Sequence, residues 1–337
     1  MIQVPILSIC IPTYNRAEYL EKSLNSLVML DEFPQIEVVI SDNCSTDGTQ
    51  VLCERFCSRY PNIVYHRNEE NIFDRNFPAV LMRATGVYRK LCNDSLLYES
   101  GSLKYIIGIV TQNIESRPFL FFLNGRPTFR KKLREITYCD DFDTFCYLAG
   151  CFLTSIACFG LWENQIDDLE EEFVNCEQHL WQTCKALKIV SQNKNALVLT
   201  KALFRAQYIK NKDVSYGIYT VFFEIFPKLL KEYVDTKKLS EKTCKLIRKD
   251  TLYIVAGDLI KRINDTDSQY DFGEQSDFMS LILKDYRNEA YYLDFIIKYK
   301  LGLWWQKNIV SLREQMTKNR FGKILLFVKR KLRLRLY

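Results

Sequence analysis

Three short polar segments of the sequence contain residue types that can bind a charged ligand. Residues 12–16 read PTYNR, residues 41–49 read SDNCSTDGT, and residues 92–94 read CND. A carboxylate such as Asp94 can hold a divalent cation, because one or two carboxylates suffice when a substrate supplies further oxygens. Asp, Asn, Ser and Gly also favour turns and helix caps, so the second segment could serve the fold alone.

Each polar segment follows an apolar, β-branched run that predicts a strand. The predicted strands are residues 6–14, 36–43, 62–68 and 88–92. Helical spacing over residues 17–30 and 75–84 predicts helices between them. Strands alternating with helices predict an α/β fold with a mostly parallel sheet flanked by helices, and ligands bind beyond the carboxyl ends of such strands. We therefore expect the polar segments to meet at one edge.

The composition indicates a globular protein with reduced thiols. The 337 residues, 47% of them hydrophobic, are enough for one large or two modest domains. The twelve cysteines form no CxxC pair and only two histidines accompany them, so we expect buried thiols of a cytoplasmic protein. The start of the chain does not resemble a secretory signal. The uncharged window over residues 144–162 is expected to be a buried core segment, because it contains glycines and hydroxyl residues.

The net charge of +6 comes from the end of the sequence. Residues 318–337 contain eight basic residues and no acidic one, while the rest of the chain has 39 basic and 41 acidic residues. The body thus shows none of the basic excess typical of proteins that bind nucleic acid. We expect the tail to lie on an anionic membrane surface as a basic amphipathic helix. An edge strand and a solvated end are the alternatives.

The segments IPTYNR and VVISDNCSTDGT, with the acidic stretch about fifty residues later, resemble the family-2 glycosyltransferases. The spacing of NEENIFDRNFPAVLMRATGVY resembles the abequosyltransferase-type branch, whose members build O-antigens and capsules. The resemblance is specific over residues 5–104 and fades through about residue 210. It implies the GT-A fold, with a transferase domain over 1–210 that has a nucleotide-sugar half (1–105) and an acceptor half (106–210). A helical region (211–317) and the tail (318–337) would follow.

The resemblance also implies roles for individual residues. Asp42 would accept a hydrogen bond from the nucleobase, and Asp94 would bind Mg²⁺ or Mn²⁺. Cys92 and Ser95 depart from the acidic pattern of the family, which leaves Asp94 as the one carboxylate of that turn. The residues expected to bind the nucleotide sugar are Pro12, Thr13, Tyr14, Arg16, Asp42, Asn43, Asp47, Arg75, Asn76 and Asn93.

An inverting transfer needs a base for the acceptor hydroxyl, and the sequence leaves several candidates open. A predicted helix start with Asn175 as N-cap would place Glu177 in the first turn. His179 is the rival, because an imidazole suits proton transfer near neutral pH. Asp140, Asp141 and Asp143 form a further acidic group.

The expected function is that of an inverting, metal-dependent glycosyltransferase of bacterial surface polysaccharide synthesis. Its expected partners are a nucleotide-sugar donor, a glycan acceptor on polyprenyl diphosphate, and the inner membrane surface; nucleic acid is not expected. The departures at Cys92 and Ser95 favour one alternative, a scaffold subunit without activity. A nucleotidyltransferase is another, although the N-terminal part lacks a glycine-rich basic phosphate loop.

Overall fold

A computed structural model describes residues 4–126, 133–166, 179–209, 217–257 and 278–301. The chain divides into two compact units. The first consists of Met1–Ile209 with Thr220–Arg248, and the second of Lys210–Tyr219 with Lys249–Tyr337. The division at residue 210 expected from the sequence stays a prediction.

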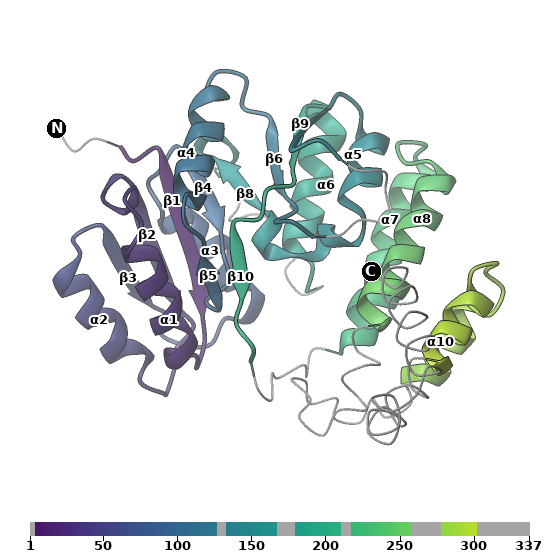
Figure 1. Cartoon of the computed structure of the whole chain (residues 1–337), viewed down its shortest axis with the longest axis horizontal. Helices are drawn as coiled ribbons and strands as arrows, with labels where there is room; N and C mark the ends of the chain where they lie inside the picture. The colour runs from purple at the N-terminus through teal and green to yellow at the C-terminus, as the bar shows by residue number, and fades with distance from the viewer. Residues whose placement is uncertain (1–3, 127–132, 167–178, 210–216, 258–277, 302–337) are drawn as a thin grey trace, which may run out of the picture. The chain divides into compact units, whose positions relative to one another are not determined.

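A five-stranded sheet forms the centre of the first unit (Figure 1). Its strands lie in the order β3 (Ile63–Arg67), β2 (Glu37–Asp42), β1 (Leu7–Thr13), β4 (Tyr88–Leu91) and β8 (Gly160–Trp162). The first four strands run parallel, and β8 is antiparallel to β4. The predicted α/β class and mostly parallel sheet are therefore confirmed.

The register of the parallel strands brings their polar ends together. Thr13 pairs with Asp42, and Asp42 pairs with Arg67. Because β4 pairs with β1 from Leu7 to Cys10, the turn after β4 lies beside the end of β1. The backbone N–H of Cys92 continues this pairing by donating to Cys10 O at 2.9 Å.

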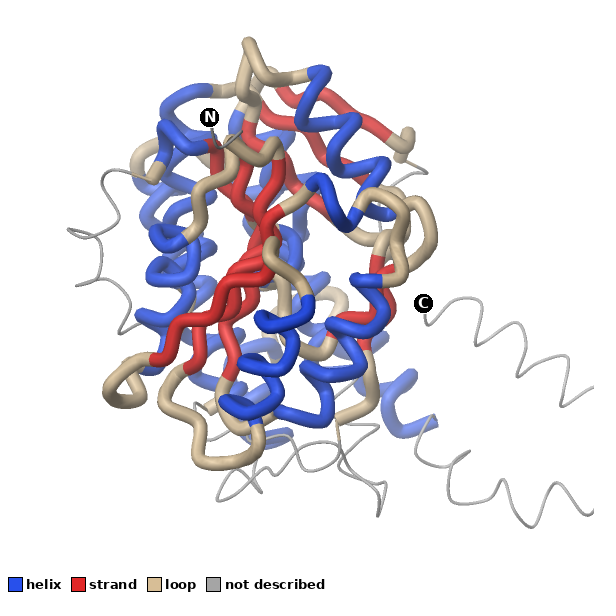
Figure 2. Tube along the Cα trace, turned by 90° about the vertical axis from the view of Figure 1, so that its left-hand side faces the viewer, coloured by secondary structure: helices blue, strands red, loops and turns tan. Residues whose placement is uncertain are grey.

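Helices cover both faces of this sheet (Figure 2). Alternate residues of a strand face opposite sides. Leu7, Ile9 and Ile11 of β1 share a buried core with apolar residues of α1 (Ala17–Val28) and α2 (Thr49–Arg59). On the other side, α3 (Asn76–Arg83) packs against β1 and β2. Both faces of the central strands β1 and β2 are thus buried, as their near-continuous apolar sequences require.

Among the described residues between 96 and 206, two smaller sheets and further helices complete this part of the first unit. A three-stranded sheet has the order β6 (Phe119–Phe122), β9 (Ala196–Leu199) and β7 (Ile136–Cys139), and β5 (Leu96–Tyr98) pairs with β10 (Phe204–Ala206). The helices are α4 (Ser102–Gln112), α5 (Phe142–Ala149) and α6 (Trp181–Asn193). Aromatic rings fill this core; Phe119, Phe121 and Phe159 lie within 6.0 Å of Phe145 or of one another, measured between ring centroids.

The uncharged window over residues 144–162 contributes to that core. It contains most of α5, the 3-10 turns η3 (Gly150–Thr154) and η4 (Ile156–Cys158), and β8, and most of its apolar side chains are buried. The expectation of a buried core segment is confirmed. None of the helices in the described part of the chain has the length and apolar character that crossing a membrane requires.

The region after residue 216 is helical, as predicted. It contains the π-helix η7 (Thr220–Ile225), α7 (Phe226–Asp235), α8 (Glu241–Thr251), the π-helix η8 (Leu252–Ala256) and α10 (Phe278–Tyr286). In the second unit the Tyr219 hydroxyl donates to Asp285, and the Tyr253 ring packs edge-on against Phe295 at 5.5 Å. The basic tail over residues 318–337 lies outside the described residues.

One helix start differs from the prediction. The helix α6 begins at Trp181, and His179 precedes it with φ of 56°. A residue in this left-handed conformation does not continue a right-handed helix. The predicted N-cap Asn175 and the Glu177 that follows it lie outside the described residues.

Candidate functional site

Asp94 lies in the turn after β4, close to residues that follow β1. Its side chain is buried, with 6% of the residue exposed. The Thr13 hydroxyl donates to Asp94 Oδ2 at 3.0 Å, and Arg16 Nη1 lies 3.8 Å from Asp94 Oδ1. Arg16 stands directly before α1. Two of the polar segments therefore meet at one carboxylate, and a cationic side chain accompanies it.

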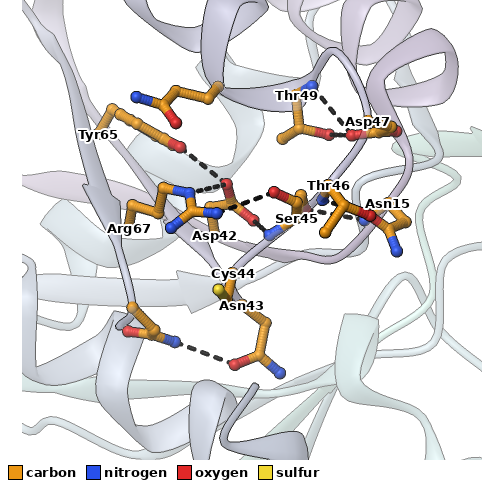
Figure 3. Close-up of polar contacts among 12 residues, drawn as sticks. Asn15, Asp42, Asn43, Cys44, Ser45, Thr46, Asp47, Thr49, Tyr65 and Arg67 are labelled. Carbon is orange, nitrogen blue, oxygen red and sulfur yellow. Dashed lines mark hydrogen bonds and ion pairs between the residues drawn. The ribbon is translucent and has the colours of Figure 1, made fainter. Parts of the chain in front are cut away.

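Asp42 is the centre of a second cluster, at the end of β2 (Figure 3). It is fully buried, and its carboxylate accepts hydrogen bonds from the Ser45 N–H at 2.9 Å and the Tyr65 hydroxyl at 2.7 Å. Arg67 Nε lies 3.9 Å from the same carboxylate. Burial, and then the bond to Asp42, raise the pKa of Tyr65, so the phenol remains a donor. Tyr65 and Arg67 both come from β3.

The loop after β1 is tied to the loop after β2. The Asn15 N–H donates to Ser45 Oγ at 2.8 Å, and the Thr46 N–H donates to Asn15 Oδ1 at 2.7 Å (Figure 3). Asp47 accepts from the Ala17 N–H at 3.0 Å and from the Thr49 N–H at 2.9 Å. Against the opposing effect of burial, bonds from Thr49 and Ala17 lower the pKa of Asp47. Its carboxylate thus connects the first turns of α1 and α2. This structural role is sufficient to explain why residue 47 is an aspartate, even if it binds no ligand.

Four amide side chains, Asn43, Asn68, Asn71 and Asn76, form an asparagine network between β2, β3 and α3. Asn68 Nδ2 donates to Asn43 Oδ1 at 3.0 Å and to Asn76 Oδ1 at 3.1 Å. Asn76 Nδ2 donates to the Ser41 carbonyl at 2.9 Å, and Asn43 Nδ2 donates to Asn71 Oδ1. The network holds the segment from Asn68 to Asn76 against the end of the sheet.

Four residues at this edge adopt the left-handed conformation although they are not glycine. They are Asn15 after β1, Cys44 after β2, Phe73 before α3 and His179 before α6, with φ of 51°, 64°, 51° and 56°. Such residues are uncommon, and they cluster at functional sites. Phe73 is also 76% exposed.

The remaining nucleotide-binding candidates lie in the same loops. Pro12 is buried in β1, Tyr14 is 43% exposed, and Arg75 is exposed at the end of the 3-10 turn η2 (Phe73–Arg75). Asn93 is half-buried beside Asp94. The ten candidates thus lie in the connections that follow β1, β2, β3 and β4 and in the residues that flank them, and their contacts with a ligand stay predictions.

The candidate bases have different surroundings. His179 Nδ1 lies 3.1 Å from Asp74 Oδ2, and the two side chains are 40% and 25% exposed. Burial raises the pKa of Asp74, although the neighbouring imidazole opposes this. Asp141 caps α5 by accepting from the Thr144 N–H at 2.8 Å. Asp143 accepts from the Ser240 N–H at 2.6 Å and from the Thr243 hydroxyl at 2.8 Å.

Sequence reasoning missed three residues of the edge: Tyr65, Arg67 and Asp74. A signal existed for the first two, because residues 62–68 were predicted to be a strand and its end must lie beside the end of β2. No sequence signal pointed to Asp74, since its partner is 105 residues away.

A divalent metal would depend on Asp94. Across the described residues no three His, Cys, Asp or Glu side chains converge on one point. Cys92 belongs to the buried core, and burial raises the pKa of its thiol, so it is not a suitable ligand. The accessible chemistry is one buried carboxylate, which accepts a hydrogen bond from Thr13 and lies beside Arg16. This donor set fits Mg²⁺ or Mn²⁺ that takes its other ligands from phosphates and water.

The N-terminal third matches a known family. Residues 8–113 match the model described as glycosyl transferase family 2. Abequosyltransferase RfbV of Salmonella typhimurium is 48% identical over 86 residues, which make up 25% of this chain and 26% of RfbV. The match spans about a quarter of the length of the curated relatives. The resemblance to family-2 glycosyltransferases and to an abequosyltransferase is confirmed for this part of the chain.

Two solved structures share the fold over a longer stretch. Residues 1–349 of TarS from Staphylococcus aureus, in complex with UDP-GlcNAc, align with 73% of this chain and 71% of that chain, with a TM-score of 0.53 and 18% identity. The mannosyltransferase PcManGT from Pyrobaculum calidifontis, in complex with GDP-Man and Mn²⁺, covers 91% of this chain and 89% of that chain, with a TM-score of 0.50 and 14% identity. These likenesses confirm a GT-A type fold.

Proposed function

We propose that this protein transfers a sugar from a nucleotide-sugar donor to a glycan acceptor, with inversion at the anomeric carbon. The observation that carries the proposal is the meeting of Asp94, Thr13 and Arg16 at the carboxyl edge of the sheet, within the segment that matches family 2. Ligands of open α/β sheets bind at this edge. RfbV is named as an abequosyltransferase, and TarS was solved with UDP-GlcNAc, which supports a nucleotide-sugar donor here.

The cluster around Asp42 and the cluster around Asp94 bind different parts of the donor, the nucleobase and the diphosphate. Asp42, held between Ser45 and Tyr65, accepts an N–H of the nucleobase through a remaining lone pair. Arg16, beside Asp94, binds the diphosphate as a cationic side chain. Tyr14, which is exposed in the loop after β1, has an aromatic ring that can pack against the nucleobase.

Asp94 would hold Mg²⁺ or Mn²⁺ together with the diphosphate. When bound, the ion neutralises the charge that develops on the departing nucleoside diphosphate. Thr13 orients the Asp94 carboxylate through its hydroxyl, and Arg16 adds a fixed positive charge on the opposite oxygen. PcManGT was solved with Mn²⁺, which supports a divalent ion in this fold.

The acceptor is a glycan linked to polyprenyl diphosphate, and the basic tail holds the protein at the membrane surface. This part of the proposal rests on the relationship to an abequosyltransferase and on the eight basic residues of positions 318–337. Deleting the tail should release the protein from anionic liposomes and lower transfer to a lipid-linked acceptor more than to a soluble analogue.

A donor screen tests the proposed activity. The full chain is incubated with a panel of UDP-, GDP-, CDP- and TDP-sugars, lipid-linked acceptors and Mn²⁺, and mass spectrometry follows the acceptor. A product heavier by one sugar residue, absent after EDTA treatment, supports the proposal. Nucleotide-sugar binding in calorimetry without any transfer across the panel would instead favour a scaffold subunit.

A further inference from the structure

Phe73 is an aromatic residue whose ring lies open to solvent at the edge of the proposed site. Of the phenylalanine side chains that the structure describes, it is the only exposed one, at 76%, and the others are buried or half-buried. Phe73 begins η2, in the connection from β3 to α3. A single exposed apolar residue is common on protein surfaces, so the backbone and the surroundings of Phe73 decide whether this one is informative.

The backbone of Phe73 is held in a conformation that a phenylalanine rarely adopts. Its φ is 51°, in the left-handed region. The Phe73 N–H donates to Asn71 Oδ1 at 2.9 Å, and its carbonyl accepts from Asn43 Nδ2 at 3.3 Å. Asn43 Oδ1 also accepts from the preceding Ile72 N–H at 2.9 Å. Strained residues persist only where their surroundings fix them, and they cluster at ligand sites, so the asparagine network maintains an unfavourable backbone that presents this ring.

The hydrogen bonds of Asn43 place Phe73 beside the proposed donor site. Asn43 directly follows Asp42, the residue proposed to bind the nucleobase, at the end of β2. Its backbone N–H donates to the Thr13 carbonyl at 2.9 Å, and the Thr13 hydroxyl donates to Asp94 Oδ2 at 3.0 Å. One asparagine thus contacts both the loop of Phe73 and the end of β1. The ring therefore starts from the same edge of the sheet as the residues proposed to bind the donor.

The residue after Phe73 contacts the later half of the first unit. Asp74 Oδ2 lies 3.1 Å from His179 Nδ1, and His179 stands just before α6. The start of α6 is anchored in the aromatic core, because the buried Trp181 ring packs edge-on against Phe159 at 5.5 Å. Phe73 therefore lies next to a point where the proposed donor edge meets the half for which the family resemblance implies acceptor binding.

A phenyl ring can bind a ligand through its π-face but not through conventional hydrogen bonds. A sugar ring in its chair form has a face on which several C–H groups point in the same direction, with the hydroxyls around the rim. Such a face packs flat on an aromatic ring, because its polarised C–H groups meet the electron-rich π-face. In the proposed function Asp42 and Arg16 bind the nucleobase and the diphosphate of the donor, whereas the sugar rings of the acceptor have been given no side chain to pack on.

We propose that the ring of Phe73 packs against the apolar face of a sugar ring in the acceptor glycan. The inference rests on the proposed glycosyl transfer and adds a residue that selects its acceptor. The bonds from Asn71 and Asn43 fix the backbone of Phe73 before the acceptor binds, so only the ring's own rotation is lost on binding. An axial hydroxyl that interrupts the apolar face of the sugar weakens this contact, so Phe73 discriminates between epimeric acceptors.

Steady-state kinetics with the donor and acceptor that react in the donor screen test this role. Phe73→Leu keeps an apolar side chain but lacks the ring, so it should raise the KM for acceptor on the order of fivefold. Phe73→Tyr keeps the ring and should stay within about twofold of the parent. The KM for donor should not change, because the ring has no contact with the donor in the proposal. Met29→Ala changes an exposed apolar residue at the end of α1; it is the control and should retain the parent values.

Saturation-transfer NMR tests the contact directly. The probe is the methyl glycoside of the sugar that ends the active acceptor, added with Mn²⁺ and the nucleoside diphosphate of the active donor. In the parent the C–H protons on one face of the sugar should receive the most saturation, and Phe73→Leu should remove this bias while Met29→Ala keeps it. Equal saturation of both faces in the parent, or the same pattern in Phe73→Leu, would overturn the inference.

The two proposals fail in different ways. If the parent transfers no sugar in the donor screen, the proposed function is wrong. If the parent transfers sugar and Phe73→Leu has the parent KM for acceptor, the function stands and the inference is wrong. A change in the KM for donor alone would assign the ring to the donor, and a change confined to the lipid-linked acceptor would assign it to the lipid. Either result, or a loss of melting temperature that accounts for the defect of Phe73→Leu, would also overturn the inference.

Discussion

The two halves of the first unit are stabilised by different kinds of contact. In the half built on β1 to β4, the loops at the sheet edge are bonded to one another through buried carboxylates and the asparagine network. In the half built on β6, β9, α5 and α6, the core is aromatic, Asp141 caps α5, and Asp143 accepts hydrogen bonds from Ser240 and Thr243. The family match covers the first half together with α4. The polar edge proposed to bind the donor therefore lies within the matched part of the chain, and a preorganised edge of this kind suits binding in one fixed geometry.

The largest effect on turnover is expected for Asp94, the carboxylate that the proposal places beside the leaving group. Asp94→Asn should lower kcat about a thousandfold, because it removes the proposed metal ligand and its charge stabilisation. Calorimetry should show that Mn²⁺ no longer strengthens binding of the nucleoside diphosphate. Asp31→Asn, an exposed substitution of the same kind, is the control. Parent turnover by Asp94→Asn would remove Asp94 from the site.

The next largest effect on kcat is expected from substitution of a candidate base, His179 or Glu177. If His179 takes the proton, His179→Ala should lower kcat on the order of a hundredfold and Glu177→Gln should have a mild effect. Both should leave the KM for donor near that of the parent. The reverse ranking would assign the base to Glu177, and two mild effects would direct attention to Asp140, Asp141 or Asp143.

A smaller effect is expected for the base-binding cluster of the donor half. Asp42→Asn should raise the KM for donor about tenfold with kcat nearly unchanged, since the contact is similar in ground and transition states. Tyr65→Phe should raise this KM about threefold, because it removes one of the bonds that orient Asp42. Melting curves must show that both variants fold. Parent KM values in folded protein would place the nucleobase elsewhere.

The smallest effect concerns stability. Burial raises the pKa of Asp74 in the folded state, so the ionised carboxyl opposes folding once the pH exceeds the unfolded value. Asp74→Asn should therefore raise the melting temperature on the order of 1 °C at pH 8. At pH 3 the carboxyl is protonated in both states, and the gain should vanish. A lower melting temperature at pH 8 would mean that the bond to His179 outweighs the cost of burial.

The sequence predicted the strands and their common edge because each strand and its polar end are adjacent in the chain. The strand ending at Asp42 and the turn at Asp94 could be located from local patterns alone. The partners of these residues could not. Tyr65 meets Asp42 only through sheet register, and His179 meets Asp74 only because α6 packs in the aromatic core. The start of α6 was misplaced because burial of Trp181, rather than a polar cap, determines it.

The left-handed residues of the edge have a consequence for protein engineering. A glycine loses the steric penalty that a side chain suffers in this conformation, which is about 1 kcal/mol. Phe73 makes a favourable position for such a change, since its ring is largely exposed and its φ is 51°. Selection for thermal tolerance alone would therefore accept glycine at this position. An aromatic residue retained there under selection for catalysis would mean that its ring meets something that the isolated chain does not contain.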